Sequence, residues 1–161
     1  MTAVRPDVPS GVRLVAVGRY LLLVSIANLA WELAQLPFYT LWRKGTAGEI
    51  AFAVVHCTAG DVLIAGSVLG LALLLLGEPG WPETGFARVA ATATLVGLGY
   101  TVWSEWLNTA VRGSWAYADA MPVLPPLGTG LLPLLQWLLL PPACLLLARR
   151  TRTTTPQGMS A

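Results

Sequence analysis

The chain has 161 residues, of which 55% are hydrophobic and only 11% are charged. Its mean hydropathy is +0.65. Soluble domains of this length carry about a quarter charged residues, so these counts exclude an ordinary water-soluble domain and also intrinsic disorder. Ten basic and eight acidic residues leave a net charge of +2, which is too small to indicate a nucleic-acid partner. The composition indicates an integral membrane protein.

Four apolar stretches predict an all-α, integral membrane four-helix bundle. They run over residues 14–38, 50–76, 89–107 and 128–148, and each is near the ~20 residues that cross a hydrocarbon core. The first two connections are short, which makes neighbouring spans antiparallel in an up-down order. We therefore expect a cytoplasmic N-terminal segment at 1–13, a transmembrane domain at 14–148 and a cytoplasmic tail at 149–161. From Thr151 to Ala161 we expect that tail to be disordered.

The orientation follows from the basic residues on the two sides of the predicted bundle. One side holds seven: Arg5, Arg13, Arg19, Arg88, Arg149, Arg150 and Arg152. The other side holds three: Arg43, Lys44 and Arg112. By the positive-inside rule, both termini are expected in the cytoplasm. The third connection, residues 108–127, is rich in tryptophan, tyrosine and proline and is expected to form an aromatic cap at the outer interface.

Polar residues inside the predicted spans are the most informative feature of the sequence. They are Asn28, Glu32 and Gln35 in the first span, His56 and Asp61 in the second, Thr101, Ser104, Glu105 and Asn108 in the third, and Gln136 in the fourth. A charged side chain at the middle of a span costs roughly 2.5–3.5 kcal/mol. Three carboxylates are therefore expensive unless they are paired, protonated or solvated, and such a cluster is by default a functional hypothesis.

Depth and helical phase place these residues around one cavity. At 1.5 Å per residue, Glu32 and His56 are expected about 9 Å below the outer surface and Asp61 about 16 Å. The i, i+4, i+7 spacing puts Asn28, Glu32 and Gln35 on one stripe, and the third span repeats it. His56 and Asp61 lie about 140° apart on their helix, so only one of them is expected to face the cavity squarely. We expect a single outward-facing polar cavity.

Three interpretations of this cavity remain open. The first is acid/base catalysis on an isoprenoid or lipid, because burial favours the neutral, proton-donating form of a carboxylic acid. Its candidate catalytic residues are Glu32, His56, Asp61, Glu105 and Asn108. Its candidate substrate contacts are Asn28, Trp31, Gln35, Trp115 and Tyr117.

The second interpretation is binding or transport of a divalent metal ion or a proton, with Glu32, His56, Asp61 and Glu105 as ligands. The third is a non-catalytic membrane subunit whose polar residues hold helices together through hydrogen bonds of roughly 0.6 kcal/mol each. Whether the chain is an enzyme therefore stays open at this point.

Cofactors and partners are less well specified. Cys57 and Cys144 lie inside apolar runs, which indicates packing residues rather than a disulfide framework. The single histidine, His56, excludes a bis-histidine haem within one protomer, and no nucleotide motif is present. A divalent metal is left open as a cofactor. The expected partners are membrane lipid and an apolar small molecule, with a homo-oligomer left open.

Three strings carry a resemblance to a known group of proteins: WELAQLPFY from Trp31 to Tyr39, HCTAGD from His56 to Asp61, and SEWLNTAVRGSWAY from Ser104 to Tyr117. Together they resemble a family of small bacterial polytopic membrane proteins, which implies only four spans and no activity. We expect a multi-pass protein of the bacterial inner membrane. The stretch from Asn28 to Glu32 is similar to the N-x-x-W-E stretch of integral-membrane terpene cyclases. That similarity implies that Glu32 acts as an acid.

Overall fold

The computed structural model describes residues 9–150. They form a mainly helical structure with α1 at Ser10–Gln35, α2 at Leu41–Lys44, α3 at Ala47–Leu76, α4 at Phe86–Trp106 and α5 at Leu131–Ala148. A 3₁₀-helix, η1 (Leu36–Phe38), follows α1, and a π-helix, η2 (Leu107–Val111), follows α4. Two short strands, β1 (Val123–Leu124) and β2 (Thr129–Gly130), pair antiparallel before α5. The mainly helical prediction is confirmed. The expected disorder of Thr151–Ala161 lies outside the described residues, as do Arg5 and Arg152.

Three helices in the described part of the chain are long and apolar enough to cross a membrane. They are Ser10–Phe38, which joins α1 to η1, with 29 residues, Ala47–Leu76 with 30 and Leu131–Ala148 with 18. α4 has 21 residues, which is about 31 Å of helix. α4 is not among these three helices. The fourth span therefore stays a prediction.

The helix starts differ from the ends of the apolar runs because local capping, not hydropathy, sets them. α3 begins at Ala47 rather than Ile50, since Thr46 forms a capping box with Glu49. In that box the Glu49 amide donates to Thr46 Oγ1 at 3.3 Å, and the Thr46 amide donates to Glu49 Oε2 at 2.7 Å. α5 begins at Leu131 rather than Gly128, because the β1–β2 pair occupies the preceding residues. Where the bilayer begins along each helix stays a prediction.

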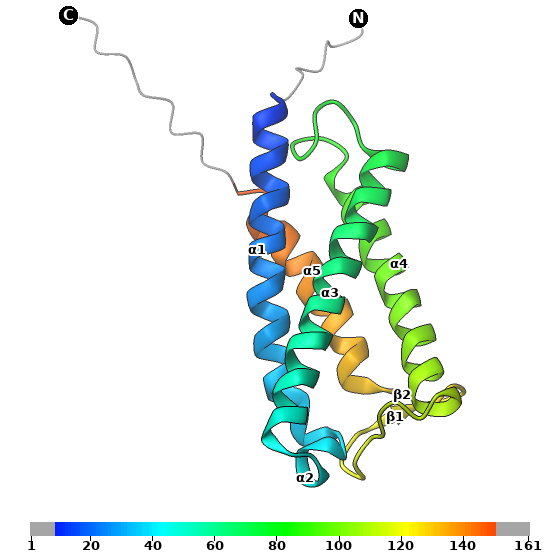
Figure 1. Ribbon diagram of the computed structural model, residues 1–161. Helices are drawn as coiled ribbons and strands as arrows, with labels where there is room; N and C mark the ends of the chain where they lie inside the picture. The colour runs from blue at the N-terminus through cyan, green and yellow to red at the C-terminus, as the bar shows by residue number, and fades with distance from the viewer. Residues whose placement is uncertain (1–8, 151–161) are drawn as a thin grey trace, which may run out of the picture.

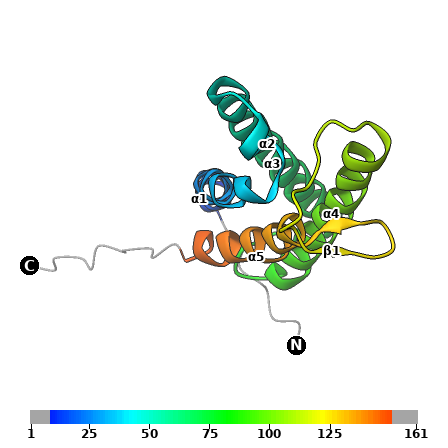
Figure 2. The same ribbon diagram turned by 90° about the horizontal axis from the view of Figure 1, so that it is seen from below.

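The four long helices form a ring. α1 packs against α3 and α5, and α4 packs against the same two helices. Figure 1 shows the helices side by side, and Figure 2 shows the ring from the end that carries α2 and β1. The interior of the ring is divided into two halves of different chemistry. The half nearer the start of α1 is apolar, with Tyr20, Val24, Leu69, Val89 and Leu145 fully or almost fully buried.

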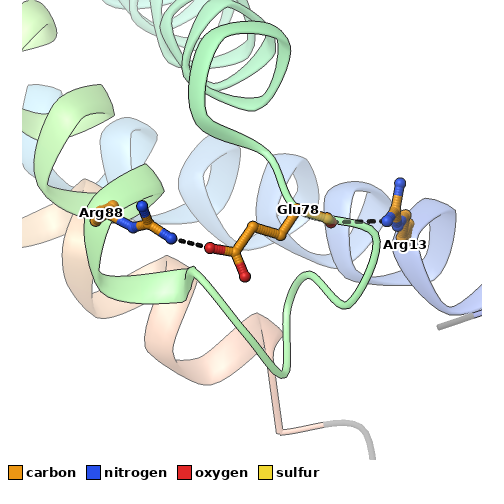
Figure 3. A network of polar contacts seen from close by, with 3 residues as sticks. All are labelled: Arg13, Glu78 and Arg88. Carbon is orange, nitrogen blue, oxygen red and sulfur yellow. Dashed lines mark hydrogen bonds and ion pairs between the residues drawn. The ribbon is translucent and has the colours of Figure 1, made fainter. Parts of the chain in front are cut away.

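One end of the ring is closed by the α3–α4 connection. Arg13 Nη2 donates to the Glu78 carbonyl oxygen at 2.7 Å and also to the Pro79 carbonyl, while the Glu78 carboxylate pairs with Arg88 (Figure 3). Trp81 from the same connection is 2% exposed. These contacts join the start of α1 to the connection and to the start of α4. We call this the closed end.

The opposite end carries η1, α2 and a segment that we call the cap, residues 112–130. The Thr40 amide donates to the Ala116 carbonyl at 3.0 Å, and the Ala118 amide donates to the Phe38 carbonyl at 2.9 Å. The rings of Tyr39 and Tyr117 pack with centroids 5.5 Å apart. The cap therefore lies against the end of α1. The helix of α4 continues through η2 before the cap begins, so residues 108–111 are helical rather than part of a loop. The outer interfacial position of the cap stays a prediction.

Candidate functional site

A cavity of about 800 Å³ lies between the helices at the end that carries the cap. This volume falls in the range of about 300–1,000 Å³ that is usual for small-molecule sites. Its lining includes all five candidate catalytic residues, which are Glu32, His56, Asp61, Glu105 and Asn108. Residues of α1, α3, α4, α5 and the cap contribute to the wall. The polar half of the ring is therefore hollow, whereas the apolar half is filled.

Two hydrogen-bond networks reach this cavity. The first, which we call the inner network, consists of Asn28, Glu32, Gln35, Asp61 and Gln136. Gln136 Nε2 lies 2.9 Å from Asn28 Oδ1, 3.2 Å from Glu32 Oε1 and 2.8 Å from Asp61 Oδ2. Gln35 Nε2 donates to Glu32 Oε1 at 2.8 Å. One side chain of α5 thus joins α1 to α3 across the ring.

Gln136 is the centre of the inner network and was not among the predicted site residues. Its amide carries two hydrogens but faces three acceptors, so the three compete for it. It is 3% exposed, and in the sequence it stands out only as the polar side chain of an otherwise apolar span. Nothing in the sequence of this span shows which other helices it contacts. The partners of Gln136 could therefore not be assigned from the sequence.

Glu32 and Asp61 lie close together, because both carboxylates accept from Gln136 Nε2. Trp137 is a further neighbour of Asp61. Two carboxyl groups can share a hydrogen bond only if one of them carries a proton. Repulsion between two neighbouring carboxylates favours the binding of one proton by the pair. The depth of each carboxylate in the membrane stays a prediction.

Close packing positions Trp137 against this pair. A Cβ atom built on Gly97 of α4 would lie 2.3 Å from the Trp137 ring, which is closer than real Cβ contacts. Trp137 itself is 3% exposed. The indole therefore lies directly on the backbone of α4, and only glycine leaves it room there.

The second network is formed by Glu105 and the cap. Tyr117 Oη donates to Glu105 Oε2, Trp115 Nε1 lies 3.4 Å from the same oxygen, and the Gly130 amide donates to Tyr117 Oη at 2.9 Å. Burial, and then the neighbouring Glu105 carboxylate, raise the pKa of Tyr117 above its ordinary value. The phenol therefore stays protonated and able to donate. The cap thus positions the only carboxylate of α4.

The remaining predicted residues take different places. His56 is on the cavity wall, where its ring stacks on Phe52 with centroids 5.4 Å apart, and it belongs to neither network. Asn108 donates back to the Ser104 carbonyl at 2.9 Å. Asn28, Trp31 and Tyr117, predicted to contact substrate, lie behind the wall and hold residues that do line it, whereas Gln35 and Trp115 line it directly.

The predicted metal ligands are brought together only in part. Glu32 and Asp61 meet, but His56 and Glu105 lie apart from them in other surroundings. Among residues 9–150, no group of three or more histidine, cysteine, aspartate or glutamate side chains is arranged to hold a metal ion. A metal held by all four residues would require them to move, so the metal interpretation stays a hypothesis without a preformed ligand set.

Comparison with protein-family models, with curated proteins and with solved structures found no match for this chain.

Proposed function

We propose that this protein is a polytopic inner-membrane protein with four spans and an intramembrane acid/base site that acts on an isoprenoid or lipid substrate. The observation that carries the proposal is the Glu32–Asp61 pair, joined by Gln136, at the wall of an 800 Å³ cavity. A carboxyl pair that holds one proton supplies both an acid and a base at one place. The cavity leaves room for a substrate beside it.

The second network fits the same chemistry. Glu105 accepts from the phenol of Tyr117, which keeps its own proton, so the carboxylate is held in place as a second acid/base group. Glu105 is 8% exposed, as is Glu32, and low exposure strengthens electrostatic interactions at such a site. The proposed roles are proton exchange with substrate for Glu32 and Asp61, and a second acid/base group for Glu105. His56, Asn108 and Trp115 are proposed to contact substrate from the wall.

The proposed four-span topology includes α4. Its only charged residues are Arg88, which pairs with Glu78 at the closed end, and Glu105, which accepts from Tyr117 at the other end. Both charges are therefore near the ends of α4 and partnered, and the helix is about 31 Å long, enough for a core of about 30 Å. Arg13, Arg19, Arg88, Arg149 and Arg150 belong to the closed end, by the course of the helices. This favours a cytoplasmic closed end, with both termini inside and the cavity facing outward.

Reporter fusions test this topology. Fusions at either terminus are expected to report cytoplasm, and a fusion at Asp119, an exposed cap residue, is expected to report the periplasm. The opposite pattern would remove the outward-facing site from the proposal.

Deuterium incorporation tests the acid/base function. Membranes that contain the native chain are incubated in deuterated water, and their lipid extract is compared by mass spectrometry with that of E32Q, D61N and E83Q membranes. Glu83 is an exposed carboxylate at the closed end, so E83Q is the matched control. We expect a lipid or isoprenoid species that gains carbon-bound deuterium with the native chain and E83Q only. No difference between native and E32Q membranes would refute the function.

The alternative function is proton or divalent-metal binding or transport. The shared proton of the Glu32–Asp61 pair favours it, since intramembrane carboxyl pairs also occur in proton pathways. Metal analysis of the purified protein separates it from catalysis. Stoichiometric metal that is lost in E32Q would support the alternative, and so would acid uptake by proteoliposomes that E32Q abolishes without any change in lipid.

A further inference from the structure

One side of the cavity lies between α3 and α4 and faces sideways, away from the axis of the bundle. Phe52 and His56 of α3 and Tyr100 and Ser104 of α4 form its two edges. Phe52 is 70% exposed and Tyr100 is 42% exposed. In Figures 1 and 2 the two helices diverge toward the end that carries the cap. The edges are thus aromatic side chains that face the surroundings of the bundle at the level of the cavity.

The other sides of the cavity are held by hydrogen bonds and by close packing, since Trp137 of α5 lies on Gly97 of α4. Gln136 links α5 to α1 and to α3, and the cap is bonded to the end of α1 through Phe38 and Thr40. At the level of the cavity, the bonds that cross the ring therefore hold α5, α1 and α3 together. No such bond crosses the side between α3 and α4 among the described residues, so a chain-shaped molecule would enter the cavity there.

The charges of the lining residues indicate which polar head group a chain-shaped molecule in the cavity would carry. The acidic residues of the wall are Glu32, Glu49, Asp61 and Glu105, whereas Arg112, the exposed first residue of the cap, is its only lysine or arginine. At the Glu32–Asp61 pair the carboxyl oxygens are hydrogen-bond acceptors, and ionised carboxylates are acceptors only. A phosphate or carboxylate placed there would meet like charge, while a hydroxyl or an amine would donate to these oxygens.

Resting on the proposed function, we infer that the cavity takes a single-chain amphiphile that enters sideways from the bilayer between α3 and α4. Its hydroxyl or amine head reaches Glu32 and Asp61, and its chain lies in the opening between Phe52 and Tyr100. This orientation brings the polar end of the substrate to the shared proton and leaves the apolar part in contact with lipid.

The chain offers a matched pair of variants for the test. Gly60 of α3 lines the cavity and a Cβ there would meet nothing within 4 Å, whereas Gly99 of α4 has the same open surroundings but does not line the cavity. A phenylalanine at Gly60 adds a large side chain at the cavity wall with no clash at its Cβ, and one at Gly99 adds the same side chain away from the cavity. Replacing glycine within a helix favours the helix in both. If G60F is not monodisperse, Ala53→Phe on the same wall takes its place.

The experiment is photolabelling of the full chain in phosphatidylcholine nanodiscs. Three probes share a palmitoyl-length chain with a diazirine and differ only in the head, which is an amine, an alcohol or a carboxylate. We expect saturable labelling of peptides around Phe52 and Tyr100 by the amine and the alcohol, and about tenfold less by the carboxylate, which loses a charge-assisted hydrogen bond. G60F should reduce the labelling at least tenfold, and G99F should leave it unchanged.

Equal labelling by all three heads, or labelling that persists in G60F, overturns the inference. Its failure is distinguishable from failure of the proposed function. If E32Q abolishes the deuterium signal but G60F does not, sideways entry is wrong and the acid/base function stands. If the probes bind as expected while native and E32Q membranes show the same deuterium content, the binding site stands and the catalytic function is wrong.

Discussion

The substitution Glu32→Gln separates a chemical role for the carboxyl pair from a structural one. Glu32 Oε1 accepts from Gln35 Nε2 at 2.8 Å and from Gln136 Nε2 at 3.2 Å. A glutamine keeps this oxygen, and its amide can donate to Asp61 in place of the shared proton. Each hydrogen bond is thus retained, and an ionisable group is replaced by a neutral one of the same shape. We expect the free energy of unfolding to rise by about 0–1 kcal/mol, a shift in Tm of about 0–4 °C.

Gln136→Leu is the contrasting substitution, because it removes the hydrogen-bond donor of the inner network and nearly keeps the volume of the side chain. In the native chain, the two amide hydrogens of Gln136 can satisfy at most two of the three acceptors fully. A buried acceptor without a donor costs about 1–3 kcal/mol. Hydrogen bonds between membrane helices are worth about 0.6 kcal/mol on average, and water in the cavity can replace part of the loss. We therefore expect a loss of about 1–3 kcal/mol, or roughly 2–12 °C in Tm.

The assay for both variants is thermal unfolding in detergent beside growth complementation of a deletion strain and the deuterium measurement. E32Q should remain inserted and as heat-stable as the native chain, yet lose complementation. Q136L should lose stability first. If E32Q loses stability in step with function, the carboxyl pair acts as an interhelical hydrogen bond, and the reasoning for an acid/base site is refuted.

Other variants test the surroundings of the two networks. Tyr117→Phe removes the donor to Glu105 and should lower the free energy of unfolding by about 1–3 kcal/mol, measured by denaturation at neutral pH. Because the pKa of Tyr117 is raised in the folded state, this advantage over phenylalanine should be constant below the ordinary tyrosine pKa of about 10 and shrink above it; a constant difference up to strongly alkaline pH would contradict this. Gly97→Ala pushes a Cβ into the Trp137 ring and should cost about 1–3 kcal/mol in thermal unfolding. Gly99→Ala, which meets nothing, should be neutral or stabilising by up to about 1 kcal/mol, and equal effects of the two would show that Trp137 is not held there.

Several features follow from the sequence alone because they depend on local composition and helical period. The mainly helical character follows from long, continuous apolar runs. The stripe of Asn28, Glu32 and Gln35 was also predictable, because a 3.6-residue period puts all three on one face of α1. In the structure that face is buried. The start of α3 directly after Thr46 also follows from local sequence, since Thr46 and Glu49 have the spacing of a capping box.

Other features were decided by how the helices pack. Helical phase indicates that His56 and Asp61 do not face the same way, but only the position of α5 across the ring from α3 selects Asp61 as the partner of Gln136. Likewise, nothing in the order of residues brings Tyr117 to Glu105, because the cap must first fold back across the end of the ring. A sequence determines which side chains share a face of one helix through its fixed local geometry. Which faces meet depends on loop lengths and packing between distant segments, and these are properties of the whole chain.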